Sequence, residues 1–304
     1  YNRIKIMKQQ CEICSGEYHE LYNGNIRDGA YGGVKISAVI YQCNQCGVQR
    51  LREKDCIPDE YYETGEYRER LEESLESKRA VVEQDEMQHH TLQAFFPNSL
   101  RGKNILDVGC GVGSLLDMLK NVSHSQIGIE PCSSHLESLS KRGYKVYPSL
   151  SEAAEDNNST IDYAFSIQVI EHVKNPREFL EEIKKLIKPR GRLLISTPNK
   201  NDILMTLLKD EFYSFFYRTQ HRWYFDENSL TKCAELAGFR VDNIHFIHRY
   251  GMANTLYWLR DRNPNGKVRI NGIDNMADSL WQAYLENSKQ SDNIYMELRV
   301  VDND

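Results

Sequence analysis

From about residue 101 onward, short apolar runs alternate with segments whose apolar residues recur at helical spacing. The apolar runs predict strands over residues 105–108, 126–131, 144–147, 161–168, 192–198, 239–251 and 291–300. One of the helical segments begins at Asn175-Pro176, is ended by Pro189 and Gly191, and carries Leu180 and Ile183 on one face. The regular alternation predicts an α/β fold with a doubly wound sheet.

Three alternating glycines, Gly109, Gly111 and Gly113, join the first of these strands to a helix. Glycine adopts positive φ readily and lets the backbone approach a ligand closely, and the following helix directs unpaired N–H groups at that ligand. The turn therefore suits a carboxylate or a phosphate. Its spacing is not the GxGxxG of dinucleotide sites, and the GK[ST] ending of a phosphate loop is missing. An ordinary strand-to-helix turn is the alternative.

Acidic residues stand at the ends of the first two strands. Asp107 precedes the glycine turn, and Glu130 ends the second strand. A carboxylate can accept two hydrogen bonds from a vicinal diol, so Glu130 is the candidate for a ribose clamp. A solvated acid at a strand end is the alternative.

The segment DVGCGVG, which contains Asp107 and the three glycines, resembles motif I of the class I S-adenosylmethionine-dependent methyltransferases. The phrases IEHVKNP and LIKPRGRLLISTPN resemble motifs II and III, and the similarity covers roughly residues 101–238. The small-molecule branch, which includes the ubiquinone-biosynthesis type, is the most similar. The resemblance implies a seven-stranded Rossmann-like sheet and S-adenosylmethionine as cofactor. The cofactor-binding residues that it implies are Asp107, Gly109, Cys110, Gly111, Gly113, Glu130 and Gln168. We expect Cys110 to pack beside the cofactor and not to act as a nucleophile.

Four cysteines near the start of the chain form two CxxC pairs separated by 28 residues: Cys11, Cys14, Cys43 and Cys46. Two such knuckles suit tetrahedral Zn²⁺, and four thiolates leave no open position, so we expect a structural zinc site. The long intervening segment leaves room for a β-hairpin that includes residues 34–42. Two disulfides or redox chemistry at one pair are the alternatives. No secretory signal is present, which favours reduced thiols.

These features divide the chain into three parts. We expect a zinc-ribbon-like module over residues 1–60, a helical linker and cofactor lid over 61–100, and the methyltransferase domain over 101–304, with an acceptor-site insertion at about 250–290. Methyltransferases with a cysteine-rich front end carry a tyrosine stretch after it. Tyr61, Tyr62 and Tyr67 match that stretch, and the resemblance implies that they close over the cofactor; packing at a domain junction is the alternative.

A methyltransferase often needs a base that takes the acceptor's proton. Glu171 and His172 follow the fourth strand, at the edge of the sheet where ligands bind, and His221 follows the fifth strand. The segment around His221 resembles the HEHxxYF pattern of sugar C-methyltransferases, but Gln220 replaces its glutamate. Methylation at carbon needs a strong base, whereas a neutral histidine suffices for a hydroxyl. We therefore expect O-methylation with His221 as base and His172 and Glu171 beside it; structural histidines are the alternative.

The expected acceptor is a sugar or a related polar small molecule, and the expected role is in carbohydrate biosynthesis. Plausible contacts are Arg249, Tyr250, Asn254 and Trp258, because aromatic rings stack on sugars and Arg or Asn binds their oxygens. Packing of Trp258 against the core is the alternative. A C-methyltransferase acting on a nucleotide-linked keto sugar and a non-catalytic cofactor-binding adaptor remain open as other functions.

The charge balance excludes one class of partner. The formal net charge is -6 and no basic stripe is present, which argues against nucleic acid. No run of eighteen apolar residues and no lipidation motif occurs. We therefore expect a soluble, cytoplasmic protein without membrane contact; the oligomeric state cannot be inferred.

Overall fold

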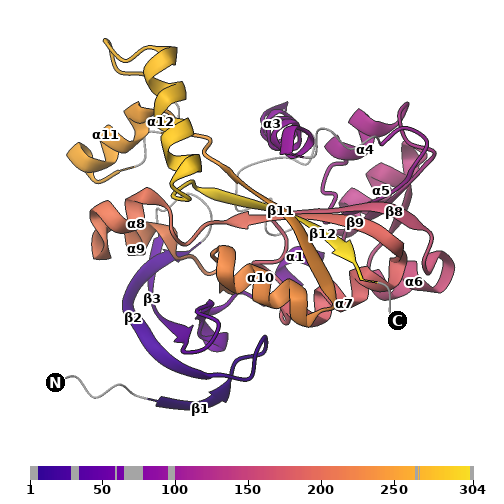
Figure 1. Ribbon diagram of the computed structural model, residues 1–304, viewed down its shortest axis with the longest axis horizontal. Coiled ribbons are helices and arrows are strands. Elements are labelled where there is room, and N and C mark those ends of the chain that lie inside the picture. Colours follow the sequence, from indigo (N-terminus) through magenta and orange to yellow (C-terminus); the bar gives the residue numbers. More distant parts are fainter. Residues whose placement is uncertain are drawn as a thin grey trace.

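A seven-stranded sheet forms the centre of the protein, in the order β11-β12-β9-β8-β5-β6-β7 (Figure 1). The computed structural model describes residues 6–28, 34–58, 60–64, 78–94, 100–263, 266 and 268–301. The strands are β5 (Asn104–Val108), β6 (Ser125–Ile129), β7 (Lys145–Tyr147), β8 (Ile161–Ile167), β9 (Ile187–Pro198), β11 (Phe239–Ile247) and β12 (Asn293–Val300). The predicted Rossmann-like fold with seven strands is confirmed.

The strand order reverses beside β5, which pairs in parallel with β6 on one side and with β8 on the other. Strands β6 and β7, and likewise β8 and β9, are also parallel, whereas β12 runs antiparallel to both of its neighbours. In such sheets, ligands bind in the crevice at the carboxyl ends of the strands where the order reverses. The crevice therefore lies beyond Val108 and Ile129.

Helices cover both faces of this sheet because successive residues of its strands point in opposite directions. On β5, Leu106 and Val108 pack in the cluster that includes residues of α7, and Ile105 packs with residues of α4. The helices around the sheet are α3 (Lys78–Ala94), α4 (Ser114–Leu119), α5 (Ser133–Lys141), α6 (Leu150–Asn157), α7 (Pro176–Leu186) and α10 (Glu227–Leu236). Figure 1 shows α3 and α4 on one side and α7 and α10 on the other.

The helix predicted after Asn175 begins as expected but ends earlier. The Asn175 side chain accepts hydrogen bonds from the N–H groups of Arg177 and Glu178, and Pro176 occupies the first turn. The helix stops at Leu186, ahead of Pro189, because Ile187 is buried and pairs with Ile161 of β8. Strand β9 therefore starts before the predicted residue 192.

A second, antiparallel sheet lies at the start of the chain, in the order β1-β2-β3-β4-β10. Its strands are β1 (Ile6–Gln10), β2 (Glu17–Asp28), β3 (Val34–Cys43), β4 (Gln49–Leu51) and β10 (Trp223–Tyr224). The hairpin expected over residues 34–42 is present as β3, paired with β2. Strand β10 comes from the far end of the sequence and pairs with β4, so this sheet is completed by residues outside 1–60. A short 3₁₀ helix (Glu53–Asp55) and α1 (Glu60–Glu63) follow β4.

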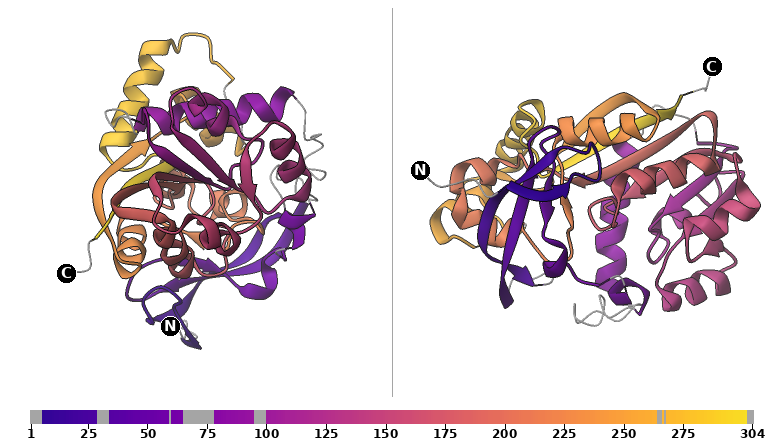
Figure 2. Two further views of the ribbon diagram at one scale, coloured as in Figure 1. Left: turned by 90° about the vertical axis from the view of Figure 1, so that its right-hand side faces the viewer. Right: turned by 90° about the horizontal axis from the view of Figure 1, so that it is seen from below.

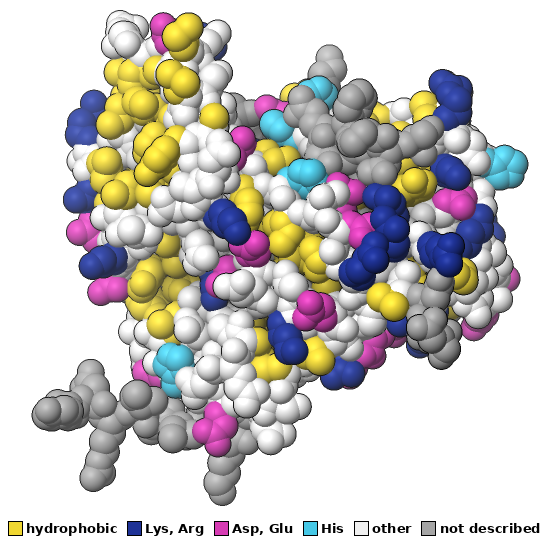
Figure 3. Space-filling model, in the orientation of Figure 1, with side chains coloured by type: hydrophobic (Ala, Val, Ile, Leu, Met, Phe, Trp, Pro, Cys, Tyr) yellow, Lys and Arg dark blue, Asp and Glu magenta, His cyan; other side chains and the backbone are white. Residues whose placement is uncertain are grey.

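Two helical pairs extend beyond the sheet. Helices α8 (Ile203–Leu208) and α9 (Asp210–Phe216) follow β9, and α11 (Met252–Asp261) and α12 (Asn275–Asn287) separate β11 from β12. The predicted helix around residues 276–285 is α12, whereas α8 and α9 are not evident in the sequence. Figures 1 and 2 show α11 and α12 projecting together, and Figure 3 shows apolar side chains gathered over them. Among the described residues, no helix is long and apolar enough to cross a membrane.

The two sheets share one hydrophobic cluster, and Trp223 is its largest fully buried side chain. The indole Nε1 donates to the carbonyl of Val173 over 2.8 Å, and the Arg50 guanidinium lies 5.2 Å from the ring centroid. Because the indole joins the two sheets, the N-terminal sheet should unfold together with the rest of the chain.

Trp223→Ala should therefore lower the free energy of unfolding by about 3 to 5 kcal/mol. Urea unfolding followed by fluorescence and by far-ultraviolet circular dichroism measures this loss. Met276→Ala, at a side chain that is 71% exposed, is the control and should change stability by less than about 0.5 kcal/mol. A separate early transition for the N-terminal sheet in the unmutated protein would contradict the shared core.

Candidate active site

The glycine turn adopts a backbone that other residues tolerate poorly. Gly109 and Gly111 have φ values of 76° and 54°, in the region that favours glycine. A Cβ at Gly109 would collide with Val169, and one at Gly111 would collide with the side-chain amide of Gln84. The turn at the end of β5 therefore requires glycine at these two positions.

Glu130 ties this turn to the end of β6. Its Oε2 accepts a hydrogen bond from the Gly111 N–H over 2.8 Å, and its Oε1 accepts one from the Cys132 N–H over 3.0 Å. A carboxylate has about four acceptor positions, so each oxygen can still accept from a ligand. The two strand ends predicted to cooperate are in direct contact.

Asp107 lies beside Glu130 and is 2% exposed, and its Oδ2 has no hydrogen-bond partner among the described residues. Burial, and after it the charge of Glu130, raises the pKa of Asp107 to about 7. Two buried carboxylates so close together favour a cationic ligand, because a positive charge relieves their repulsion.

The other residues predicted to bind the cofactor have different surroundings. The Cys110 side chain packs with Leu116 and Leu139, and burial raises the pKa of its thiol well above the ordinary value. The Cys110 side chain therefore packs in a small apolar cluster next to the turn. Gln168 has a positive φ of 57°, and its side-chain amide donates to Ser196 and to Asn293 over 3.2 and 3.1 Å. Gln168 thus turns the chain away from the end of β8.

Helix α3 lies against the glycine turn, within the segment predicted as a lid. The Oε1 of Gln84 accepts a hydrogen bond from the Val112 N–H over 3.3 Å. One turn later, Gln88 is buried, and its Oε1 has no partner among the described residues. Neither glutamine is marked by a signal in the sequence, because the highly charged segment before them has the composition of a solvated helix.

A second polar group lies beyond β8 and consists of Glu171, His172 and His221, whose side-chain ligand atoms all lie within 4.8 Å of one another. Glu171 Oε1 is 3.8 Å from His172 Nε2. The two imidazole rings are 4.8 Å apart, centroid to centroid, and nearly perpendicular. The structure thus brings together the three residues considered as proton acceptors.

Hydrogen bonds fix the orientation of His172. Its Nδ1 is 2.7 Å from the Gln220 carbonyl oxygen, which can only accept, so Nδ1 carries the proton. The Tyr62 hydroxyl lies 2.9 Å from the same nitrogen and donates to the same carbonyl. The lone pair of neutral His172 is therefore on Nε2, facing Glu171. Tyr67 lies outside the described residues.

Burial sets the protonation of this group. It lowers the pKa of His172 to about 4 and that of His221 well below its ordinary value, so both rings are neutral near pH 7. Burial raises the pKa of Glu171 to about 7; this side chain is 1% exposed, and neither of its oxygens has a hydrogen-bond partner among the described residues.

Two arginines that sequence reasoning missed lie near the histidines. Arg27 of β2 forms a β-bridge with Arg218, and both charges lower the pKa of His221. The Arg27 guanidinium lies 3.9 Å from the Phe215 ring centroid. The N-terminal sheet therefore contributes a cation to the surroundings of His221, through a contact between residues distant in sequence.

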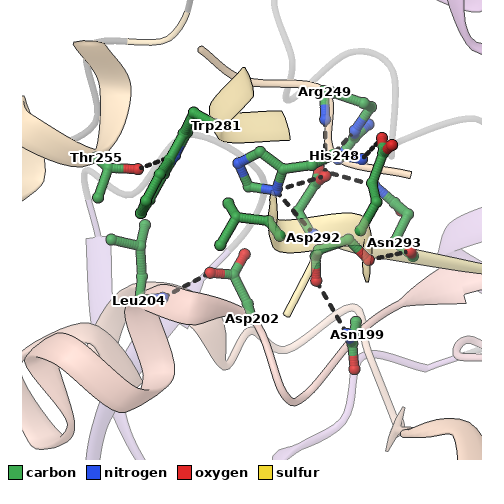
Figure 4. A network of polar contacts seen from close by, with 12 residues as sticks. Asn199, Asp202, Leu204, His248, Arg249, Thr255, Trp281, Asp292 and Asn293 are labelled. Carbon is green, nitrogen blue, oxygen red and sulfur yellow. Dashed lines mark hydrogen bonds and ion pairs between the residues drawn. The ribbon is translucent and has the colours of Figure 1, made fainter. Parts of the chain in front are cut away.

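The predicted acceptor contacts belong to two environments. Arg249 pairs with Asp292, its Nε donating over 2.7 Å, in the network that also contains His248, Asn293, Asn199 and Asp202 (Figure 4). Trp258 packs edge-on against Phe212 and Phe215, with centroids 4.9 and 4.8 Å apart, and is buried. Trp258 is therefore a core residue and offers no face to an acceptor.

The four cysteines of the N-terminal sheet converge. Cys11 Sγ is 3.8 Å from Cys46 Sγ, and Cys14 Sγ is 3.4 Å from Cys43 Sγ; all four sulfurs lie within 4.8 Å of one another. Tetrahedral zinc with bonds of about 2.3 Å holds its sulfurs roughly 3.8 Å apart. The donor set and spacing therefore fit a structural zinc ion.

Glu171→Gln tests the buried carboxyl group. The folded protein holds this proton up to about pH 7, whereas the unfolded chain releases it near about pH 4.3, so the group makes stability fall as pH rises between these values. Between about pH 5 and about pH 8, the variant should therefore lose about 2 to 3 kcal/mol less stability than the unmutated protein. Urea unfolding at both pH values measures this, and equal losses would show that Glu171 ionises normally.

Comparisons with known proteins identify the family of the chain. The family model described as a methyltransferase domain matches residues 79–244, more than half of the chain. The ubiquinone biosynthesis O-methyltransferase of Coxiella burnetii (strain Dugway 5J108-111) is 26% identical over 178 residues, which cover 55% of this chain and 76% of that protein. The mitochondrial ubiquinone biosynthesis O-methyltransferase of Dictyostelium discoideum is 31% identical over 118 residues, 33% of this chain and 37% of that protein. The chain thus spans little more than a third of the Dictyostelium relative's length.

A solved structure of a SAM-dependent methyltransferase from Archaeoglobus fulgidus has a TM-score of 0.50 at 17% identity, and covers 71% of this chain and 94% of that one. At this identity the likeness shows the fold alone. With the family match, the sheet order and the glycine turn between β5 and α4, it follows that the chain belongs to the methyltransferase domain family and is an S-adenosylmethionine-dependent methyltransferase.

Proposed function

We propose that this methyltransferase methylates a hydroxyl group of a sugar or a related polar small molecule. The observation that carries the proposal is the orientation of His172, whose Nε2 lone pair faces the buried Glu171 carboxylate beyond the end of β8. The names of the Coxiella and Dictyostelium relatives support transfer to oxygen.

The glycine turn and the two strand-end acids would hold the cofactor. Glu130 keeps acceptor positions for the ribose hydroxyls, and Asp107 offers an unpartnered oxygen to the positively charged aminoacyl end. Helix α3 serves as a lid, supported by the contact of Gln84 with Val112. S-adenosylmethionine, when bound, supplies an electrophilic methyl group for in-line displacement.

His172 would accept the proton of the acceptor hydroxyl as the new C–O bond forms. Its Nε2 is the free nitrogen, and Glu171 stabilises the imidazolium that results. His221, which the sequence favoured as base, packs edge-on against this ring. Among the described residues, no hydrogen bond fixes the His221 ring, so we assign it to lining the acceptor site.

Oxygen is the proposed position of methylation because of the strength of the base. A buried imidazole whose pKa is about 4 is too weak to enolise a sugar, but a hydroxyl becomes acidic during transfer. The buried Glu171 carboxylate, with its raised pKa of about 7, is the observation that keeps C-methylation of a nucleotide-linked keto sugar as second candidate.

His172→Ala should lower turnover about 10²- to 10⁴-fold, since the general base is lost, while the dissociation constant for S-adenosylhomocysteine stays within about twofold, a factor worth less than 0.5 kcal/mol. The measurement is transfer of labelled methyl to a panel of sugars, nucleotide sugars and glycan precursors. His89→Ala, at an exposed position of α3, is the control. Unchanged turnover in the His172 variant would place the base elsewhere.

Nuclear magnetic resonance of the methylated product distinguishes the two candidate reactions. The proposal expects a methoxy signal and a product whose free hydroxyl count falls by one. A methyl group on carbon would instead establish the second candidate.

We also propose that Cys11, Cys14, Cys43 and Cys46 bind one structural Zn²⁺, and that residues 1–60 form the module built around it, with residues 101–304 as the catalytic domain. Metal analysis should find zinc in the purified protein, and Cys43→Ser should remove it and lower the melting temperature, because metal binding is coupled to folding. Cys56→Ser, outside the cluster, should retain the metal. Zinc-free, fully stable wild-type protein would refute the site.

A further inference from the structure

A buried histidine lies beside the proposed ribose clamp. His135, on α5, is 5% exposed, and neither ring nitrogen has a hydrogen-bond partner among the described residues. Buried polar side chains in native proteins usually have partners. These buried nitrogens are therefore available to a hydrogen-bonding group of a ligand.

The ring is placed next to the carboxylate that is expected to bind the cofactor. His135 Nδ1 is 3.8 Å from Glu130 Oε1, beyond hydrogen-bond length. Glu130, Cys132 and His135 place their ligand atoms within 4.8 Å of one another. His135 lies in the first turn of its helix, where side chains lean back toward the helix start, and here that is the end of β6.

A single hydroxyl group can bond to both side chains if it lies to one side of the line that joins the two atoms. A hydroxyl oxygen about 2.7 Å from the carboxylate oxygen and about 2.9 Å from Nδ1 meets both at close to a right angle. A hydroxyl has one donor and two acceptor positions. It can therefore donate to Glu130 and accept from the His135 N–H at the same time.

We propose that His135 is a second ribose-binding residue, which donates a hydrogen bond to the same cofactor hydroxyl that Glu130 accepts from. The inference rests on the proposed role of Glu130. A site that both donates to and accepts from one hydroxyl discriminates strongly against a ligand that lacks it, because the site's buried groups are then left unpaired.

The test compares the dissociation constants of S-adenosylhomocysteine and its 2′-deoxy and 3′-deoxy analogues, measured by titration calorimetry. The unmutated protein should prefer the ribose form over at least one analogue. His135→Phe, which keeps the ring and removes the nitrogens, should reduce that preference about tenfold. His135→Asn, whose amide nitrogen replaces Nδ1, should retain most of it. His124→Phe, at an exposed position before β6, should leave it unchanged.

Glu130→Gln separates this inference from the cofactor assignment. If both residues bind one hydroxyl, Glu130→Gln should also reduce the preference, and the double variant should lose little more than either single variant. If Glu130→Gln reduces the preference and His135→Phe weakens all three ligands equally or not at all, His135 only packs and the proposal is wrong. If neither variant changes the preference, the ribose clamp itself is wrong. Should His135→Phe fail to fold, His135→Met, which also lacks a donor, takes its place with the same expected result.

Discussion

Burial of carboxylates along one edge of the sheet is the constraint on which the site depends. Asp107 lies near the end of β5, Glu171 follows β8 and Asp202 follows β9, all at the carboxyl ends of the strands. Burial raises the pKa of each acid to about 7. A buried ionised acid is costly unless a cation or hydrogen bonds compensate it. In the proposed cofactor site, Asp107 faces the α-ammonium group of S-adenosylmethionine, whose charge compensates the ionised acid. Without the cofactor, the negative charge of ionised Asp107 is uncompensated, and the bound cofactor would neutralise it.

Two other acids at this edge, Asp292 and Glu130, have partners within the protein. Asp292 pairs with Arg249, and Glu130 accepts the amides of Gly111 and Cys132. Asp292 and Glu130 have partners within the protein and therefore stabilise this edge of the sheet. Asp107 and Glu171 have unpartnered oxygens among the described residues, and we propose that these face ligands.

Local signals made the central sheet predictable and indicated a candidate cofactor site. The glycine turn and each cysteine pair span only a few residues, and the acids lie at the ends of two successive strands, Asp107 in β5 and Glu130 directly after β6. Contacts between distant segments were not predictable. Strand β10 has only two residues, and its pairing with β4 leaves no periodic pattern.

The same limit applies to single side chains. Gln84 and His135 sit on helices whose sequences resemble ordinary surface helices, and only the packed structure reveals that they face the glycine turn or Glu130. The sequence favours His221 as the base, whereas the structure supports the proposal of His172 for a similar reason. The partner that orients His172 is a backbone carbonyl, that of Gln220, and a backbone group leaves no signal in a side-chain motif.

The segment from Gln220 to Tyr224 belongs to both halves of the molecule. The N–H groups of Arg222 and Trp223 donate to the carbonyl of Glu171, while Trp223 and Tyr224 form the last strand of the cysteine-bearing sheet. A change that loosens the cysteine cluster will therefore also loosen the backbone that orients His172. If the cysteines bind zinc and His172 is the base, as proposed, metal occupancy and proton transfer are linked although the ion does not approach the substrate. The proposed cofactor site on β5 and β6 does not share this link.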